Sequence, residues 1–138
     1  MSHGFSSYRT MHSIMSRDFA SHGYIVFAIN HKDMSCMHTK TKGGVDIYVD
    51  KSQKLHEPQI RPKQIVIRES EILALIQEMS DPKFLAQFNF GAEIKLDLEN
   101  IVIAGHSFGG MTALSSAEMF PNVKASILLD PWFYTYEK

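Results

Sequence analysis

Apolar residues follow two different spacings along the chain, and these predict alternating strands and helices. Short, nearly continuous apolar runs predict buried strands over residues 24–29, 100–104 and 124–129. Apolar residues three or four positions apart predict helices over residues 10–20, 63–79 and 108–119. A chain in which strands and helices alternate in this way is expected to form a parallel sheet with helices on its faces.

The first two helices are defined by their apolar stripes and by the residues that end them. The first carries Met11, Ile14, Met15 and Phe19 on one face and is expected to stop near Gly23. The second ends at Asp81-Pro82, and its expected buried stripe is Ile65, Ile72, Leu75, Ile76 and Met79.

Residues 30–62 are polar and irregular, and they predict a long surface loop with a short strand over residues 45–49. A loop of this length inside a compact domain is commonly functional or disordered.

Composition narrows the function classes. The 138 residues carry a formal net charge of -1, so charge points to neither nucleic acid nor an anionic membrane as a partner. One cysteine, Cys36, excludes a disulfide within the chain. It fits a reducing compartment, so a cytoplasmic location is expected. Neither a signal peptide nor an apolar run of the ~20 residues that span a bilayer is visible.

The candidate chemistry centres on Gly105-His106-Ser107-Phe108-Gly109-Gly110, which lies between a predicted strand and a predicted helix. A G-x-S-x-G sequence in that position is typical of the nucleophile elbow of an α/β-hydrolase, where a strained turn exposes the serine hydroxyl above the sheet. Ser107 is therefore the candidate nucleophile. The alternative is an ordinary glycine-rich turn with a capping serine.

Asp130 is the candidate acid, because it ends the strand that follows the elbow. Asn30-His31, Ser107 and Asp130 all fall at carboxyl ends of predicted parallel strands, where such sheets bind ligands. The alternative for Asp130 is a turn residue before Pro131.

An oxyanion hole needs two backbone N–H donors. One is expected from Phe108, the residue after the nucleophile, and the other from Phe5 in His3-Gly4-Phe5. The alternative for His3-Gly4 is a chance dipeptide.

The sequence contains no histidine at the position expected for the catalytic base. All seven histidines precede Asp130, whereas the order in this fold is serine, acid, histidine, and His106 is interpreted as structural. A metal site made of His31, Asp33, Cys36 and His38 matches no zinc spacing, so neither a metal nor a cofactor is expected.

Taken together, the chain resembles the serine-dependent platelet-activating-factor acetylhydrolase family (the lipoprotein-associated and intracellular type). The resemblance rests on segments spread over most of the chain: Ser2-His3-Gly4-Phe5 with Tyr8-Arg9-Thr10; residues 20–26 with His31-Lys32-Asp33 and Ser35; Arg61, Gln64, Ile65 and Arg68; residues 105–110; and Leu129-Asp130 with Trp132.

The resemblance implies a partial α/β-hydrolase fold with Ser107 as nucleophile, Asp130 as acid, and an oxyanion hole from Phe5 and Phe108. The implied reaction is hydrolysis of a short sn-2 acyl ester of a phospholipid through an acyl-serine, with no metal, and with lipid docking through segments outside this chain. The family's histidine lies beyond Asp130, and the strand leading into His3 is also lacking. Residues 1–138 are thus expected to be one incomplete domain, from oxyanion loop to acid-bearing strand, with the first strands and C-terminal part missing.

Little turnover is expected from these residues alone, because loss of a triad member typically costs about 10⁴-fold. Two alternatives stay open: another carboxylesterase of the same fold, and a non-catalytic chain.

Overall fold

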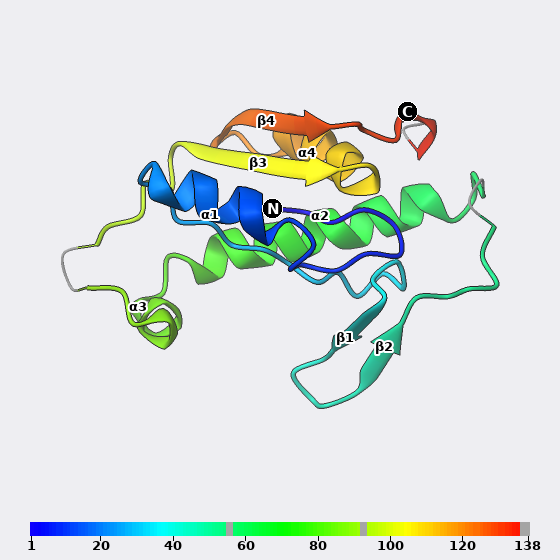
Figure 1. Ribbon diagram of the computed structural model, residues 1–138, viewed down its shortest axis with the longest axis horizontal. Helices are drawn as coiled ribbons and strands as arrows, with labels where there is room; N and C mark the ends of the chain where they lie inside the picture. The colour runs from blue at the N-terminus through cyan, green and yellow to red at the C-terminus, as the bar shows by residue number, and fades with distance from the viewer. Residues whose placement is uncertain (55–56, 92–93, 136–138) are drawn as a thin grey trace.

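The computed structural model describes residues 1–54, 57–91 and 94–135 (Figure 1). Its helices are α1 (Ser13–Ser21), α2 (Arg61–Glu78), α3 (Pro82–Leu85) and α4 (Phe108–Met119), with short 3-10 turns η1 (Ala86–Phe88) and η2 (Phe133–Thr135). Its strands are β1 (His38–Lys40), β2 (Asp46–Tyr48), β3 (Ile101–His106) and β4 (Val123–Leu129).

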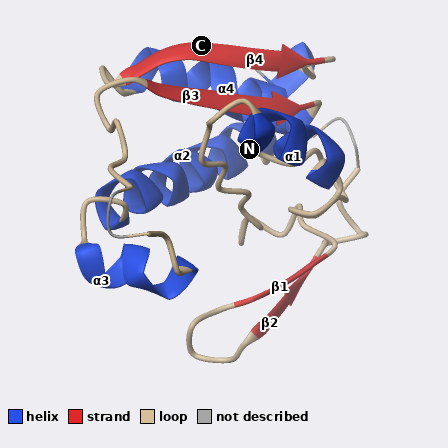
Figure 2. Cartoon of the chain, turned by 60° about the vertical axis from the view of Figure 1, so that its left-hand side comes forward, coloured by secondary structure: helices blue, strands red, loops and turns tan. Residues whose placement is uncertain are grey.

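A parallel β3–β4 pair connected by α4 forms the centre of the molecule. Their register places Ile103 beside Ser126 and His106 beside Leu129. Helix α4 packs on the back of both strands, and α1 lies in front of them (Figure 2). The predicted parallel sheet with helices on both faces is therefore confirmed, as are the strands and helix on either side of Ser107.

The start of the chain adds a further position to this sheet. Ser2 forms parallel bridges with Gly105 of β3 on one side and with Ile29 on the other. The Ser2 N–H donates to Ala104 O over 2.8 Å, and the Ile29 N–H donates to Met1 O over 3.3 Å. The residues leading into His3-Gly4 thus lie between residue 29 and β3, although the sequence predicts that this strand is lacking.

The strand predicted over residues 24–29 is wrong except at its last residue. Ile29 alone bridges Ser2, and Tyr24 is 57 % exposed instead of buried. A strand needs a partner along its length, and here only the first residues of the chain lie beside the end of this run. Its apolar composition therefore does not produce a ladder in the described residues.

Helix α1 forms where predicted, and Gly23 follows it with a φ of +92°, a backbone angle that favours glycine. Its apolar stripe is only partly buried, since Met15 and Phe19 are half-buried whereas Ile14 is 75 % and Met11 52 % exposed. The periodicity correctly indicated a helix but not how much of its apolar face is covered.

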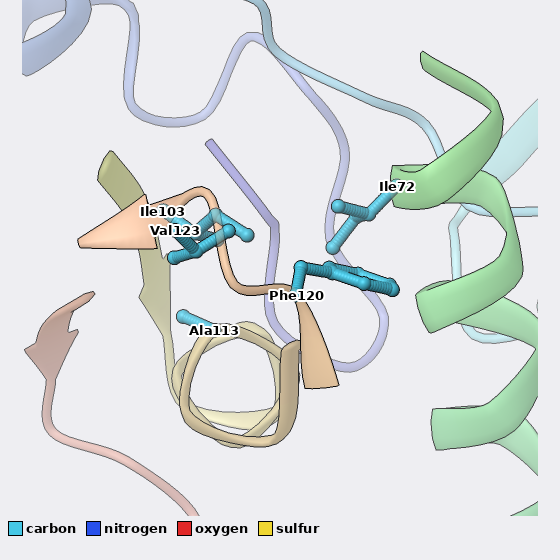
Figure 3. Close-up of a cluster of buried hydrophobic side chains, with 5 residues drawn as sticks. All are labelled: Ile72, Ile103, Ala113, Phe120 and Val123. Atoms are coloured by element: carbon cyan, nitrogen blue, oxygen red, sulfur yellow. The ribbon is translucent and has the colours of Figure 1, made fainter. Parts of the chain in front are cut away.

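The core lies between α4, the sheet and α2. Ile72 of α2, Ile103 of β3 and Ala113 of α4 meet Phe120 and Val123 from the turn into β4 (Figure 3). Ala113 has no exposed surface, and its small side chain lets α4 lie close on the strands. This core fixes the elbow, because β3 and α4 are the two elements that the elbow joins.

The long loop contains a hairpin. β1 and β2 pair antiparallel, with Thr39 beside Ile47. The strand expected over residues 45–49 is confirmed as β2, whereas β1 was not predicted because His38-Thr39-Lys40 has no apolar pattern.

Helix α2 buries polar as well as apolar residues. The predicted stripe is confirmed at Ile65, Ile72 and Met79, but Arg61 and Arg68 have no exposed surface. No helix in the described ranges is both long and apolar enough to cross a membrane.

Candidate active site

Ser107 lies in the sharp turn between β3 and α4. Its φ of 53° and ψ of -117° lie outside the regions that L-residues ordinarily occupy. Such strain persists only when the surrounding structure holds it, and it is common at functional sites. The backbone therefore has the geometry predicted for a nucleophile elbow.

Two glycines make this turn possible. A Cβ on Gly105 would lie 2.8 Å from Gly110 N and closer still to the Gly109 carbonyl. A Cβ on Gly109 would lie 2.7 Å from His3 O and closer still to Ser2 O. Real Cβ atoms do not approach this closely. A larger residue at position 105 would therefore open the elbow itself, and one at position 109 would push α4 away from Ser2 and His3.

The residues on either side of Asp130 are joined to Ser107 through the backbone. The Ser107 N–H donates to Leu129 O over 2.9 Å, and the Trp132 N–H donates to Ser107 O over 3.0 Å. Asp130 lies between these two bonds, is exposed, and has a φ of 43°. Within the described part of the chain, no side chain or backbone N–H donates to its carboxylate.

The two candidate oxyanion donors lie on either side of Ser107. Phe108 follows it directly, and Gly4 packs so closely that a Cβ there would be 3.3 Å from the Ser107 Cβ. Neither the Phe5 nor the Phe108 N–H donates to a backbone acceptor among the residues described. Both N–H groups are therefore available to an oxygen atom next to Ser107.

Two hollows meet at Ser107. One, of about 470 Å³, is lined by Met11, His12 and His106; the other, of about 540 Å³, is lined by Asp50, Lys51 and Trp132, among other residues. Phe5, Ser6 and Ser107 line both. Ser107 therefore borders open space on both sides.

Sequence reasoning missed a buried polar network behind the oxyanion loop. His31 Nε2 lies 2.8 Å from Ser2 Oγ, and His31 Nδ1 lies 2.7 Å from Glu71 Oε2. The order serine–histidine–carboxylate imitates a catalytic triad, but Ser2 and His31 are buried and have no route to a substrate. This network therefore connects Ser2, just before the oxyanion loop, to helix α2.

Burial shifts the titration of this network. It raises the pKa of Glu71 to about 7. Burial, with the charge of Arg68 as the next cause, lowers the pKa of His31 well below 6.5. Both shifts favour the uncharged forms of Glu71 and His31. A protonated Glu71 would donate to His31 Nδ1, and His31 Nε2–H would donate to Ser2 Oγ.

The four residues weighed as metal ligands have separate partners. Asp33 pairs with Arg68 at 2.7 Å, His31 contacts Glu71, and His38 contacts Asp46 at 2.8 Å. The Cys36 thiol donates to His38 O. Among the residues described, no group of three or more histidine, cysteine or acidic side chains is arranged to hold a metal ion.

Comparison with known proteins agrees with this geometry. The family model for platelet-activating factor acetylhydrolase, isoform II, matches residues 1–138. The chain belongs to that family. Its membership confirms the resemblance drawn from the oxyanion, helix α2, elbow and acid segments.

Relatives within the family cover nearly all of this chain. The platelet-activating factor acetylhydrolase of Canis lupus familiaris is 31% identical over an alignment of 150 positions, which covers 95% of this chain and 34% of the relative. The protein of the same name from Cavia porcellus is 29% identical, over 96% of this chain and 34% of its own length. The chain thus spans about a third of the length of these relatives.

A solved structure confirms the fold class. The ferulic acid esterase from Streptomyces cinnamoneus superposes with a TM-score of 0.72 over 99% of this chain and 37% of its own, at 24% sequence identity. The predicted partial α/β-hydrolase fold is therefore confirmed.

Proposed function

We propose that these residues supply the nucleophile, acid and oxyanion hole of a serine esterase that removes a short sn-2 acyl group from platelet-activating-factor-like phospholipids. The observation that carries the proposal is the strained Ser107 backbone, braced to the Asp130 segment and packed against Gly4. Family membership supports the substrate class.

In the first step a base takes the proton from Ser107 Oγ, which attacks the carbonyl carbon of the ester. The carbonyl oxygen gains the displaced electron pair, and the Phe5 and Phe108 N–H groups donate to it. Collapse of this intermediate breaks the bond to the lipid alcohol, which leaves with a proton from the base. Water then attacks the acyl-serine in the same way, which releases the acyl group as a carboxylic acid and restores the Ser107 hydroxyl.

Asp130 has the role of orienting that base and stabilising its charged form. Its exposure directly after β4, between the two backbone bonds to Ser107, supports this role, because an exposed carboxylate is open to an imidazole. In this fold the histidine follows the acid, and none of residues 131–138 is a histidine. The base is therefore proposed to come from outside these residues.

The first test is labelling of Ser107 by a fluorophosphonate probe, because such probes react with activated serines. The gene product that contains these residues is expected to label, and its Ser107→Ala variant is not. Equal labelling of both proteins would refute Ser107 as the nucleophile. Ser80→Ala is the matched control, since this serine is exposed, lines neither hollow beside Ser107 and should leave labelling unchanged.

The second test separates substrate classes. The same protein is expected to hydrolyse an acetyl-thioester phospholipid faster than simple aryl esters or feruloyl esters. A preference for the simple esters would favour a general carboxylesterase. No turnover of any ester, together with no labelling, would favour a non-catalytic chain.

A further inference from the structure

The peptide that carries the Phe5 N–H is held by the side chain of His3. His3 Nδ1 lies 2.7 Å from Gly4 O. A carbonyl oxygen only accepts hydrogen bonds, so Nδ1 must carry the proton and donate. The other ring nitrogen, Nε2, is then bare, and it accepts from the His31 N–H over 3.1 Å. Both nitrogens are satisfied by one neutral tautomer.

This bond sets the direction of the oxyanion donor. In a trans peptide the C=O and N–H point in opposite directions. The Gly4 carbonyl and the Phe5 N–H belong to the same peptide, so fixing Gly4 O on the His3 ring also fixes where the Phe5 N–H points. Glycine at position 4 would otherwise rotate freely, and the peptide needs an external restraint.

Arg68 fixes the preceding peptide. Its Nη1 donates to His3 O over 2.9 Å, and its guanidinium lies 4.2 Å from the centre of the Phe108 ring. Asp33 accepts from Arg68 Nε at 2.7 Å, and Ser35 accepts from Nη2. Arg68 therefore touches both segments that supply oxyanion donors, and its own orientation is fixed by an ion pair.

Helix α2 makes a second contact of this kind, between an arginine and an aromatic ring. Arg61 lies two turns before Arg68, and its guanidinium is 4.3 Å from the centre of the Phe5 ring. Residues seven apart share a helix face, so α2 presents one arginine to each aromatic residue of the oxyanion hole.

We propose that His3 is a positioning residue that aims the Phe5 N–H at the oxyanion beside Ser107, with Arg68 locking the peptide before it. The proposal rests on the proposed esterase function. His3 has to stay neutral for this role, and burial, followed by the charge of Arg68, lowers its pKa to about 4. The ring therefore keeps its bare Nε2 at neutral pH.

Two substitutions at His3 separate the two bonds of the ring. The amide nitrogen of asparagine takes the place of Nδ1, so His3→Asn keeps a donor for Gly4 O and loses the acceptor for His31. The longer glutamine places its amide near Nε2, so His3→Gln keeps the acceptor and loses the donor. His22→Gln, at the exposed end of α1, is the control for a histidine outside the site.

Steady-state kinetics on the gene product is expected to show kcat lowered about 10- to 100-fold by His3→Gln, with KM changed little, because loss of a complete oxyanion donor costs about 10²–10³. His3→Asn should recover most of kcat. Equal losses in both variants, or a loss only in His3→Asn, would overturn the proposal. Thermal unfolding checks that His3→Gln remains folded.

A spectroscopic readout does not depend on turnover. Long-range ¹H–¹⁵N correlation is expected to show His3 with its proton on Nδ1 at neutral pH. A proton on Nε2 would overturn the proposal even in an active enzyme. Conversely, the Nδ1 tautomer in a protein that neither labels nor hydrolyses esters would support the His3 geometry while refuting the esterase function.

Discussion

Gly109→Ala is the substitution whose consequence follows most directly from the structure. The new Cβ would lie 2.7 Å from His3 O and closer still to Ser2 O, whereas a comfortable contact is about 3.4 Å or more. Either α4 or the Ser2–His3 strand must therefore move by about 1 Å. The movement would separate the loop that carries Phe5 from the elbow that carries Ser107.

The size of the effect is the balance of two opposing contributions. Alanine in place of glycine favours a helix by about 1 kcal/mol. Overpacking a close contact costs about 1–3 kcal/mol, and a clash between backbone atoms belongs at the upper end. We expect Gly109→Ala to lower the free energy of unfolding by about 1–2 kcal/mol. A displacement of about 1 Å at the site is also expected to slow the reaction of Ser107 by up to about 100-fold.

Trp132 provides the assay. It is the only tryptophan among the 138 residues, and its ring lies near those of Phe5 and Phe108, so the fluorescence of these residues reports unfolding of the site in urea. Labelling of Ser107 by a fluorophosphonate reports the site's reactivity. Gly43→Ala is the matched control, because the nearest atom to its new Cβ, Thr41 Oγ1, is 3.8 Å away. Equal stability and equal reactivity of Gly109→Ala and Gly43→Ala would refute the expected clash at position 109.

Two further predictions concern titration and packing. Glu71→Gln should become more stable relative to the unsubstituted protein as the pH rises from 5 to 8. The pKa of Glu71 is raised to about 7 in the folded state, so its stabilising contribution is lost between pH 4.5 and 7, whereas glutamine does not ionise. Urea unfolding at both pH values measures this, and a pH-independent difference would contradict it. Phe120→Ala, in the buried core, should lower the free energy of unfolding by about 3–5 kcal/mol. Ile14→Ser, at an exposed position, should change the free energy of unfolding by less than about 0.5 kcal/mol. Similar effects of Phe120→Ala and Ile14→Ser in the same unfolding assay would show that Phe120 does not belong to the core.

The elements around the site could be predicted because local sequence determines them. β3, α4 and β4 combine a continuous apolar run, small residues and a helix-ending Pro121, and these signals agree with one another. The relation of Ser107 to Asp130 followed from the same elements, since both residues end parallel strands.

Other features could not be predicted because they depend on contacts distant in sequence. Residues 24–29 have the composition of a strand, but only Ile29 meets a partner. Periodicity indicates apolar faces, so it could not show that Arg61 and Arg68 are buried or that they lie against Phe5 and Phe108. The support of the oxyanion loop by His3 became visible only when the ring's two hydrogen bonds were known.

The backbone bonds of Ser107 to residues 129 and 132 have a consequence for how such a site can diversify. Because both the N–H and the carbonyl of Ser107 are used by residues that flank Asp130, neither residue can shift without the other. Ser107 and Asp130 are thus held as one unit that tolerates little change. The walls of the two hollows are free of this bracing, so substitutions of Met11 and His12 on one side of Ser107, or of residues 49–53 after the β1–β2 hairpin on the other, can reshape the hollows without moving this unit.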